Sequence, residues 1–331
     1  MTNSEQRGYH GIDIGGTKIE LVAFDAAFAE VHRERIATPT EDFDAFVQAI
    51  VTLVSRGDAA LGLAAPVGIG LPGIIDIATG RQISSNVPAL NGRQVADSLQ
   101  QALGRPVAIG NDCQCFALSE AQGGAADGLP TMFGAIIGTG AGGGYCVDGR
   151  LQRGLNAVAG EWGHWTVPAP LLALHGLPVY DCPCGKQGCL ERYVAGPGMS
   201  RLHAHFGGDG AEPAAIVART NVGDALAERT LAVHLDLLAH AVAGLVLSYD
   251  PHALVLGGGL SNLAHLYERL PEAVRRHLFR GVHVPPILPP RFGDAGGARG
   301  AALLARQLAD QARRINDPPY AAPTASPKTD L

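Results

Sequence analysis

The sequence has little charge for its length and no surplus of positive charge. Charged residues make up 17% of the 331 residues, and the formal net charge is −6 at pH 7. This balance favours neither nucleic acid nor an anionic membrane surface as a partner. The hydrophobic fraction of 47% predicts a globular protein, and the chain is long enough for two domains.

Long apolar segments are absent as well. No run reaches the roughly 18 apolar residues of a membrane span, and the first ten residues contain no apolar core of a signal peptide. We therefore expect no membrane partner. Without a sign of secretion, we expect reduced thiols and a cytoplasmic protein.

Cysteine is scarce, but three of the six cysteines lie close together. Cys182, Cys184 and Cys189 have the spacing C-x-C-x4-C, within the 35 residues from Ala159 to Tyr193. Clustered cysteines without a secretion signal favour a metal site over a disulfide or merely buried thiols. Three sulfurs and one histidine nitrogen suit a closed tetrahedral zinc site.

Two histidines are candidates for the fourth zinc ligand. His164 lies upstream of the cysteines, and His175 lies in an apolar segment that is expected to be a loop. We rank His164 first for this reason. A site of three cysteines and one histidine needs no carboxylate, which leaves the neighbouring Glu161 and Glu191 for another task.

Two glycine-rich segments, residues 8–25 and 131–148, each predict a strand, a tight turn and a second strand. When they are aligned, four positions match: Gly11 with Gly134, Ile14 with Ile137, Gly15 with Gly138, and Asp25 with Asp148. The shared shape predicts a duplicated unit. Backbone N–H groups at two such turns can hold a polyphosphate from both sides, although an ordinary hairpin is the alternative for the first segment alone.

Two carboxylates follow predicted strands. Asp13 lies at the end of the first strand, where it could hold a hydrated Mg²⁺ ion. Asn111 and Asp112 follow a strand at residues 107–109 and begin a helix, which is where ligands bind in open α/β sheets. A plain helix N-cap is the alternative for Asp112. Cys113 and Cys115 lie about 200° apart on this helix, so burial is expected for them rather than metal binding.

Other segments have clear patterns. Apolar spacing predicts helices over residues 42–56, 95–103 and 225–248, and a small-residue helix opens near Gly293. Buried strands are expected at residues 67–74 and 252–260. Residues from about Asn316 onward are rich in Pro, Ala, Ser and Thr and are expected to be disordered.

In this order, the segments resemble the ROK family of bacterial sugar kinases and sugar-responsive repressors, within the actin-like sugar kinase superfamily. The runs that carry the resemblance are D-I-G-G-T-K (13–18), G-N-D (110–112), G-T-G-A-G-G-G (138–144), E-W-G-H (161–164), C-P-C-G-K-Q-G-C-L-E (182–191) and L-G-G-G (256–259). The resemblance implies a two-domain, actin-like α/β fold (sugar kinase/hexokinase, ribonuclease H-like) with a central cleft. We expect residues 1–121 to form a small domain completed by a helix at 295–314, residues 122–294 a large domain with the zinc-binding loop, and residues 315–331 a disordered tail.

The resemblance also implies a reaction. The runs S-N-V-P-A (85–89) and N-D-C-Q-C-F-A-L-S-E-A (111–121) are similar to those of bacterial N-acetyl-D-glucosamine kinases, which implies ATP-dependent phosphorylation of that sugar at its 6-hydroxyl. E-W-G-H and C-G-K-Q-G-C are also similar to ROK fructokinases, so a fructokinase, glucokinase or mannokinase stays open. A sugar-sensing repressor is the alternative from another class, but the first strand is expected to begin by Gly8, which leaves no room for an N-terminal DNA-binding domain.

Residue roles follow from the matched runs. Asp112 is implied as the catalytic base, and the sugar is expected to contact Asn86, Asn111, Asp112, Glu161, His164 and Glu191. A structural zinc ion is expected on His164, Cys182, Cys184 and Cys189. The family's common run N-D-A-N is altered here, because Cys113 and Gln114 follow Asp112. Any role of the second Asn in that run is therefore in doubt at Gln114.

ATP is expected to contact three segments, with Mg²⁺ near Asp13. They comprise Gly11, Ile12, Asp13, Ile14, Gly15, Gly16, Thr17 and Lys18; Gly138, Thr139, Gly140, Ala141, Gly142, Gly143, Gly144 and Tyr145; and Gly257, Gly258 and Gly259. The family resemblance further implies a homodimer. Nucleic acid is not an expected partner.

Overall fold

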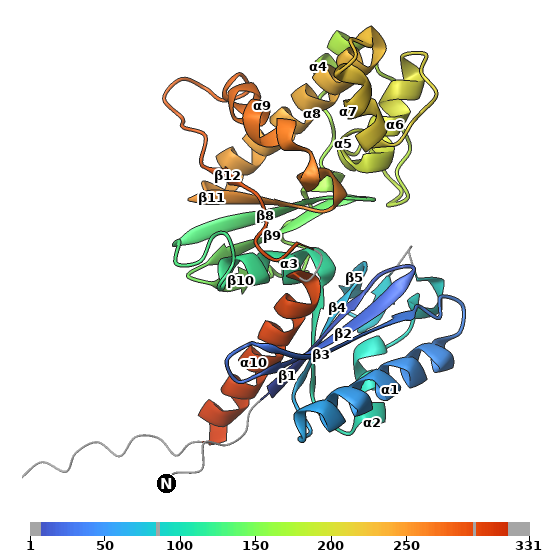
Figure 1. The fold of residues 1–331 in the computed structure, drawn as a ribbon, viewed down its shortest axis with the longest axis vertical. Helices are drawn as coiled ribbons and strands as arrows, with labels where there is room; N and C mark the ends of the chain where they lie inside the picture. Colours follow the sequence, from blue (N-terminus) through green and yellow to red (C-terminus); the bar gives the residue numbers. More distant parts are fainter. Residues whose placement is uncertain (1–7, 84–86, 294–295, 317–331) are drawn as a thin grey trace, which may run out of the picture.

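The computed structural model describes residues 8–83, 87–293 and 296–316. Two five-stranded sheets lie one above the other, and two helices pass between them (Figure 1). We call each sheet, with the helices that cover it, a lobe. Asn86 and the segment 317–331 of the expected tail lie outside the described residues.

The two sheets have the same strand order. The first sheet runs β3-β2-β1-β4-β7 and consists of β1 (Gly8–Ile14), β2 (Lys18–Asp25), β3 (Glu30–Ala37), β4 (Val67–Leu71) and β7 (Val107–Asn111). The second sheet runs β10-β9-β8-β11-β12 and consists of β8 (Thr131–Ile137), β9 (Ala141–Val147), β10 (Arg150–Gln152), β11 (Ala253–Gly257) and β12 (Ile287–Leu288). In each sheet the first three strands in sequence are antiparallel and the other two join in parallel. A separate hairpin joins β5 (Ile74–Asp76) and β6 (Arg81–Ile83).

The common order supports the expected duplication. Ile14 pairs with Ile19 at the end of the first hairpin, and Ile137 pairs with Ala141 at the end of the second. The second turn is one residue shorter than the first, so Val147 rather than Asp148 takes the position of Asp25.

Helices α3 (Asp112–Ala121) and α10 (Gly296–Asn316) are exchanged between the lobes. α3 follows the last strand of the first sheet but packs on β8 and β9 of the second. α10 comes after the last strand of the second sheet but packs on β1 and β4 of the first, and the two helices contact each other (Figure 1). The C-terminal helix therefore lies on the first sheet, and the expected division into domains stays a prediction.

Small residues allow these helices to lie close to their neighbours. A Cβ added at Gly11 of β1 would lie 1.8 Å from the carbonyl oxygen of Ala298 in α10. One added at Gly300 of α10 would lie 1.8 Å from the carbonyl oxygen of Cys115 in α3. Since real Cβ atoms do not approach so closely, only glycine fits either position.

The remaining helices cover the outer faces of the sheets. The α-helices are α1 (Phe43–Leu61) and α2 (Val95–Leu103) on the first, and α4 (Ala169–His175), α5 (Glu191–Val194), α6 (Gly196–His205), α7 (Pro213–Thr220), α8 (Ala225–Tyr249) and α9 (Ala264–Arg275) on the second. Short 3₁₀ turns are η1 (Pro88–Leu90), η2 (Trp162–His164) and η3 (Gly259–Asn262). The segment around His175 was expected to be a loop, but it is helical as far as the αL cap at Gly176.

Helix α8 is the core helix of the second lobe. It is long and apolar enough to cross a membrane by length and composition, but 67% of its apolar window is buried inside the structure. Leu237, Leu238 and Val242 are almost fully buried in the same cluster as Phe133 of the second sheet. The apolar character of the helix is therefore accounted for by packing within the lobe.

Candidate active site and metal centre

The start of α3 presents two polar side chains between the lobes. The Oδ1 atom of Asn111 accepts the backbone N–H of Cys113 at 2.9 Å, which makes Asn111 the helix N-cap. Its Nδ2 atom donates to the carbonyl oxygen of Gly73 at 3.1 Å. Since Asn111 caps the helix, the carboxylate of Asp112 in the first turn is not needed for this purpose, although it also accepts the N–H of Cys113.

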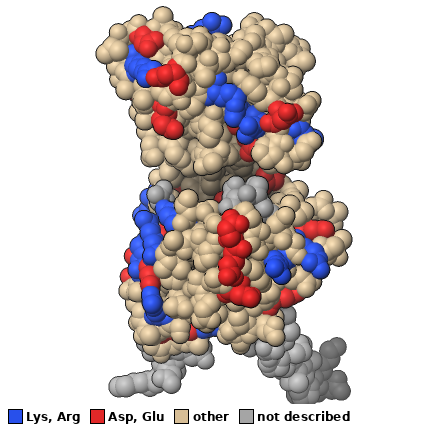
Figure 2. Space-filling model, turned by 90° about the vertical axis from the view of Figure 1, so that its right-hand side faces the viewer, with Lys and Arg blue, Asp and Glu red and all other residues tan. Residues whose placement is uncertain are grey.

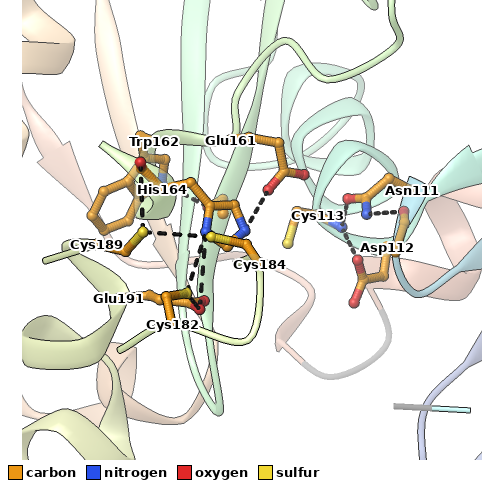
Figure 3. A network of polar contacts seen from close by, with 12 residues as sticks. Asn111, Asp112, Cys113, Glu161, Trp162, His164, Cys182, Cys184, Cys189 and Glu191 are labelled. Carbon is orange, nitrogen blue, oxygen red and sulfur yellow. Dashed lines mark hydrogen bonds and ion pairs between the residues drawn. The ribbon is translucent and has the colours of Figure 1, made fainter. Parts of the chain in front are cut away.

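Several carboxylates gather around this helix start. Figure 3 shows Asp112, Cys113 and Glu161 following one another across the site. Burial raises the pKa of Asp112, and burial together with the charges of Asp112 and Glu191 raises the pKa of Glu161 to about 7. Such shifts cluster at functional sites, because ionised groups are otherwise kept apart and hydrated.

Cys113 lies inside this acidic group, where its sequence pattern gave no sign of a role. Burial raises the pKa of its thiol, and the charges of Asp112, Glu161 and Asp13 raise it further. The thiol therefore stays protonated and donates a hydrogen bond to Asp112. Cys115, two residues on, is fully buried, as expected.

Asp13 joins the same region from the first sheet. A Cβ added at Gly297 would lie 2.6 Å from its Oδ2 atom, so the carboxylate lies against the start of α10. Its charge also raises the pKa of the thiols of Cys113 and Cys115. The structure thus brings Asp13 of β1 and Asp112, which directly follows β7, to one place.

The glycine segments expected to contact ATP lie partly in turns and partly inside strands. A Cβ added at Gly138 would lie 3.8 Å from the Cα atom of Gly258, so the second hairpin turn and the segment 257–259 are neighbours. In the first turn, Thr38 donates its hydroxyl to the carbonyl oxygen of Gly15. Thr17, Lys18 and Thr139 are exposed.

Other residues in these segments face protein. Ile12 and Ile14 are buried in the core of the first lobe, and Gly11 faces α10. The ring of Tyr145 lies 5.1 Å from that of Tyr249, and its hydroxyl donates to the Tyr249 carbonyl oxygen. A nucleotide contact by these residues stays a prediction, and for the side chains of Ile12, Ile14 and Tyr145 the packing favours a structural role.

The four expected zinc ligands lie together. One nitrogen of His164 and the sulfurs of Cys182, Cys184 and Cys189 are all within 4.8 Å of one another. The sulfurs of Cys184 and Cys189 are 3.6 Å apart, and His164 Nδ1 is 3.8 Å from the Cys182 sulfur. A disulfide needs about 2.05 Å, whereas a zinc tetrahedron with Zn–S bonds of about 2.3 Å has edges of about 3.8 Å. The donor set and its spacing therefore fit zinc.

The second histidine candidate is engaged elsewhere. His175 Nε2 lies 2.7 Å from a carboxylate oxygen of Asp236 in α8. Asp236 also bonds His277 at 2.8 Å. Among the described residues, His164 alone supplies a histidine nitrogen to the cysteine cluster.

His164 joins the metal cluster to the acidic group. Its Nδ1 atom faces the cysteines, while its Nε2 atom lies 3.9 Å from Glu161 Oε2 (Figure 3). Glu191 Oε1 lies 3.1 Å from the Cys182 sulfur and 4.0 Å from His164 Nδ1. Glu161, His164 and Glu191 therefore form one continuous wall that begins beside Cys113.

Gln114 is a further residue whose place could not be inferred from its spacing. Its side-chain amide donates to the carbonyl oxygens of Ala157 at 2.9 Å and Ala159 at 3.4 Å. These bonds tie α3, which carries Asp112, to the loop that leads into Glu161. The loop contains Ala157 in the left-handed region at φ 54°, so its conformation depends on such support.

Comparison with known proteins agrees with this arrangement. Residues 9–308 match the model of the ROK family. The chain is 47% identical to an N-acetylgalactosamine kinase of Shewanella sp. (strain ANA-3), covering 91% of this chain and 97% of that protein. It is 42% identical to an N-acetyl-D-glucosamine kinase of Photobacterium profundum, covering 89% and 98%.

A solved structure shows the same architecture. The crystal structure of a ROK hexokinase from Thermus thermophilus matches with a TM-score of 0.81 at 32% identity, covering 92% of this chain and 99% of that chain. This match confirms the expected two-domain, actin-like α/β fold. The chain belongs to the ROK family.

Proposed function

We propose that this protein phosphorylates N-acetyl-D-glucosamine at its 6-hydroxyl group with ATP. The observation that carries the proposal is the meeting of Asn111 and Asp112 with Glu161, His164 and Glu191 at one place between the lobes. Carboxylates suit sugars because each accepts two or more hydroxyl donors in fixed directions. Relatives more than 40% identical that act on N-acetylhexosamines support the choice of sugar.

Asp112 is the proposed general base. It accepts the proton of the sugar 6-hydroxyl while that oxygen attacks the γ-phosphoryl group in line. Phosphoryl transfer depends mainly on positioning and charge stabilisation, so an ordinary carboxylate is basic enough. The N-cap at Asn111 fixes the backbone from which Asp112 projects.

The proposed ATP site lies between the two hairpin turns. N–H groups of the turns at residues 16–17 and 139–140 would bind the phosphates, with the adenosine end near Gly258 and Gly259. The N–H groups of Gly15 and Gly138 already donate to the carbonyl oxygens of Lys18 and Gly140. Asp13 would hold Mg²⁺, which neutralises charge on the phosphates. Figure 2 shows the surface hollowed between the two lobes, so closure of the lobes could exclude water from the reaction.

The proposed zinc ion is structural. His164, Cys182, Cys184 and Cys189 would hold it, and zinc supplies a rigid anchor for the loop rather than a Lewis acid for phosphate. A metal on Nδ1 of His164 would leave Nε2 to meet a sugar hydroxyl. We also propose that the protein is a cytoplasmic homodimer.

N-acetyl-D-galactosamine is the second candidate substrate. The relative that is 47% identical is named for that sugar, which differs from N-acetyl-D-glucosamine only in the configuration at C4. A fructokinase, glucokinase or mannokinase would use the same base and the same phosphate turns. The choice therefore depends on the groups that meet the sugar ring, not on the reaction.

An ADP-release assay across a panel of sugars tests the proposal. We expect kcat/KM for N-acetyl-D-glucosamine to exceed that for N-acetyl-D-galactosamine, N-acetyl-D-mannosamine, glucose, mannose and fructose. Phosphorus NMR of the product should place the phosphate on O6. A clear preference for any other sugar in the panel would reject the assignment while leaving the kinase reaction intact.

A further inference from the structure

A cavity of about 340 Å³ opens beside Asn111. Its walls come from the end of β4, the β5–β6 hairpin, the end of β7, α3 and the loop that precedes Glu161. Most of its lining is apolar, including Leu71, Ile74, Ile75, Ile109 and Ala157. The described residues that line it include none from the glycine turns or the cysteine cluster, so neither ATP nor zinc accounts for it.

The cavity adjoins the proposed sugar site on two sides. Asn111 belongs to its lining and is followed at once by Asp112. Ala157, in the loop across from it, precedes Glu161 by four residues and is bonded to Gln114 of α3. A sugar held by Asn111, Asp112 and Glu161 would therefore have this cavity next to its ring.

Two buried glutamine oxygens in the cavity wall lack partners. Gln114 is 2% exposed and Gln82 is 1% exposed. Their amide nitrogens donate to the carbonyl oxygens of Ala157 and Pro72, which fixes the orientation of both amides. Neither Oε1 atom has a hydrogen-bond partner among the described residues. Both oxygens are almost inaccessible, so they lie just behind the cavity surface, and a donor in the cavity reaches them only when the wall shifts.

We infer that this cavity receives the N-acyl group of a 2-acylamino-hexose and accepts acyl chains longer than acetyl. The inference rests on the proposed function. A hexose presents several hydroxyl groups, which the apolar part of the wall disfavours. An acylamino group presents an apolar chain with one N–H donor and one carbonyl acceptor, and Arg153 in the lining can donate to the carbonyl. The lobe closure expected of such an enzyme would bring the N–H toward the glutamine oxygens.

The volume supports the longer chains. At about 30 Å³ for each water-sized volume, the cavity has room for about ten such volumes, whereas an acetyl group has three heavy atoms. Each further methylene buried against the aliphatic wall can strengthen binding up to about fourfold. The structure thus assigns substrate breadth to this cavity as well as a preference for N-acyl sugars over plain hexoses.

The test is a series of N-acetyl-, N-propanoyl- and N-butanoyl-glucosamine with ATP. We expect kcat to stay within about threefold across the series and KM to stay equal or fall, since the added methylenes are buried. If the protein phosphorylates the N-acetyl sugar but loses more than about tenfold in kcat/KM with N-propanoyl, the cavity inference is wrong. If it phosphorylates none of the three, the proposed function fails first.

A matched pair of variants locates the effect. Ile74→Phe places a larger side chain in the cavity wall and should lower kcat/KM for N-butanoyl at least about tenfold relative to N-acetyl. Ile83→Phe is the control, because Ile83 pairs with Ile74 across the hairpin but is 51% exposed and does not line the cavity. An equal change of the ratio in both variants, or no change in Ile74→Phe, would overturn the inference.

Discussion

The two lobes repeat each other in strand order but not in the groups that they place at the site. The last pairs of the two hairpins, Ile14–Ile19 and Ile137–Ala141, put Ile136 at the position of Asp13. One hairpin therefore carries a carboxylate toward the cleft and the other carries an aliphatic side chain. The comparison teaches that the repeated unit supplies the scaffold, while the side chains placed at the site differ between the two copies.

The exchanged helices differ in the same way. α3 begins with the N-cap Asn111 followed by Asp112, whereas α10 begins with Gly296 and Gly297. The glycines of α10 allow the carboxylate of Asp13 to lie against the helix start. We infer that α3 presents the groups that act on the sugar. Helix α10 instead packs closely beneath Asp13, the proposed Mg²⁺ ligand.

The largest expected effect comes from changing Asp112 at the start of α3. Asp112→Asn should fold normally but lose about 10²–10⁴-fold in kcat, because the side chain can no longer accept the proton. The control is Asp224→Asn, at another helix start, where Asp224 caps α8 and asparagine caps equally well. If Asp112→Asn keeps more than about a tenth of the wild-type kcat, the loss is too small for a general base.

The second difference between the lobes is the segment that carries Cys182, Cys184 and Cys189. Among the described residues, only the second lobe has such a cluster. Metal analysis should give about one zinc per chain for the wild type, and Cys189→Ser should lose the metal and much of the lobe's stability. Cys146→Ser, also buried in the second lobe but in β9, should keep the zinc. Active, folded wild-type protein without zinc would refute the metal assignment.

Local sequence was enough for features that depend on neighbouring residues. The hairpins around Gly15 and Gly138 and the cluster from Cys182 to Cys189 are each contained in a short segment, so their spacing predicted them. His164 was ranked above His175 because the segment of His175 was expected to be an apolar loop, although that segment is helical. The structure agrees with the ranking, because His175 bonds Asp236 instead.

Features that depend on packing between distant segments could not be predicted in this way. The exchange of α3 and α10 rests on contacts such as Gly300 against Cys115, which are far apart in sequence. Cys113 and Glu161 likewise become neighbours only when α3 packs on the second sheet, where both lie near Gly142 of β9. Asp112 was a candidate N-cap by spacing, but only the side-chain geometry shows that Asn111 has that place.

The glycines beneath the exchanged helices allow a direct test of the two copies. Gly11→Ala should destabilise the protein by about 3 kcal/mol, because its Cβ would meet the backbone of α10. Gly134→Ala, at the equivalent position in β8, should cost about 1–2 kcal/mol, since its Cβ would lie 2.9 Å from Ala117. Urea unfolding measures both values. Equal losses of stability would show that α3 packs on β8 as tightly as α10 packs on β1.

The smallest expected effect concerns one buried histidine in each lobe, His10 and His234, and the dependence of stability on pH. His10 in β1 bonds Asp58 at 2.8 Å, which opposes the lowering of its pKa by burial. His234 in α8 bonds only the carbonyl oxygen of Val194 among the described residues, and burial lowers its pKa to about 4. The unfolded chain therefore binds more protons than the native one between about pH 4 and 6.5, so stability falls as the pH falls through this window.

From pH 7 to pH 5, His234 should lower the free energy of unfolding by about 2 kcal/mol. His234→Gln keeps a donor for the Val194 carbonyl oxygen but does not titrate. Between pH 7 and pH 5, its free energy of unfolding should therefore fall by about 2 kcal/mol less than that of the wild type. Urea unfolding of both proteins at the two pH values measures the difference, and the other titrating groups cancel. Parallel losses in the two proteins would mean that His234 stays hydrated enough to be protonated in the native state, and that the second lobe is less tightly closed around α8 than its packing indicates.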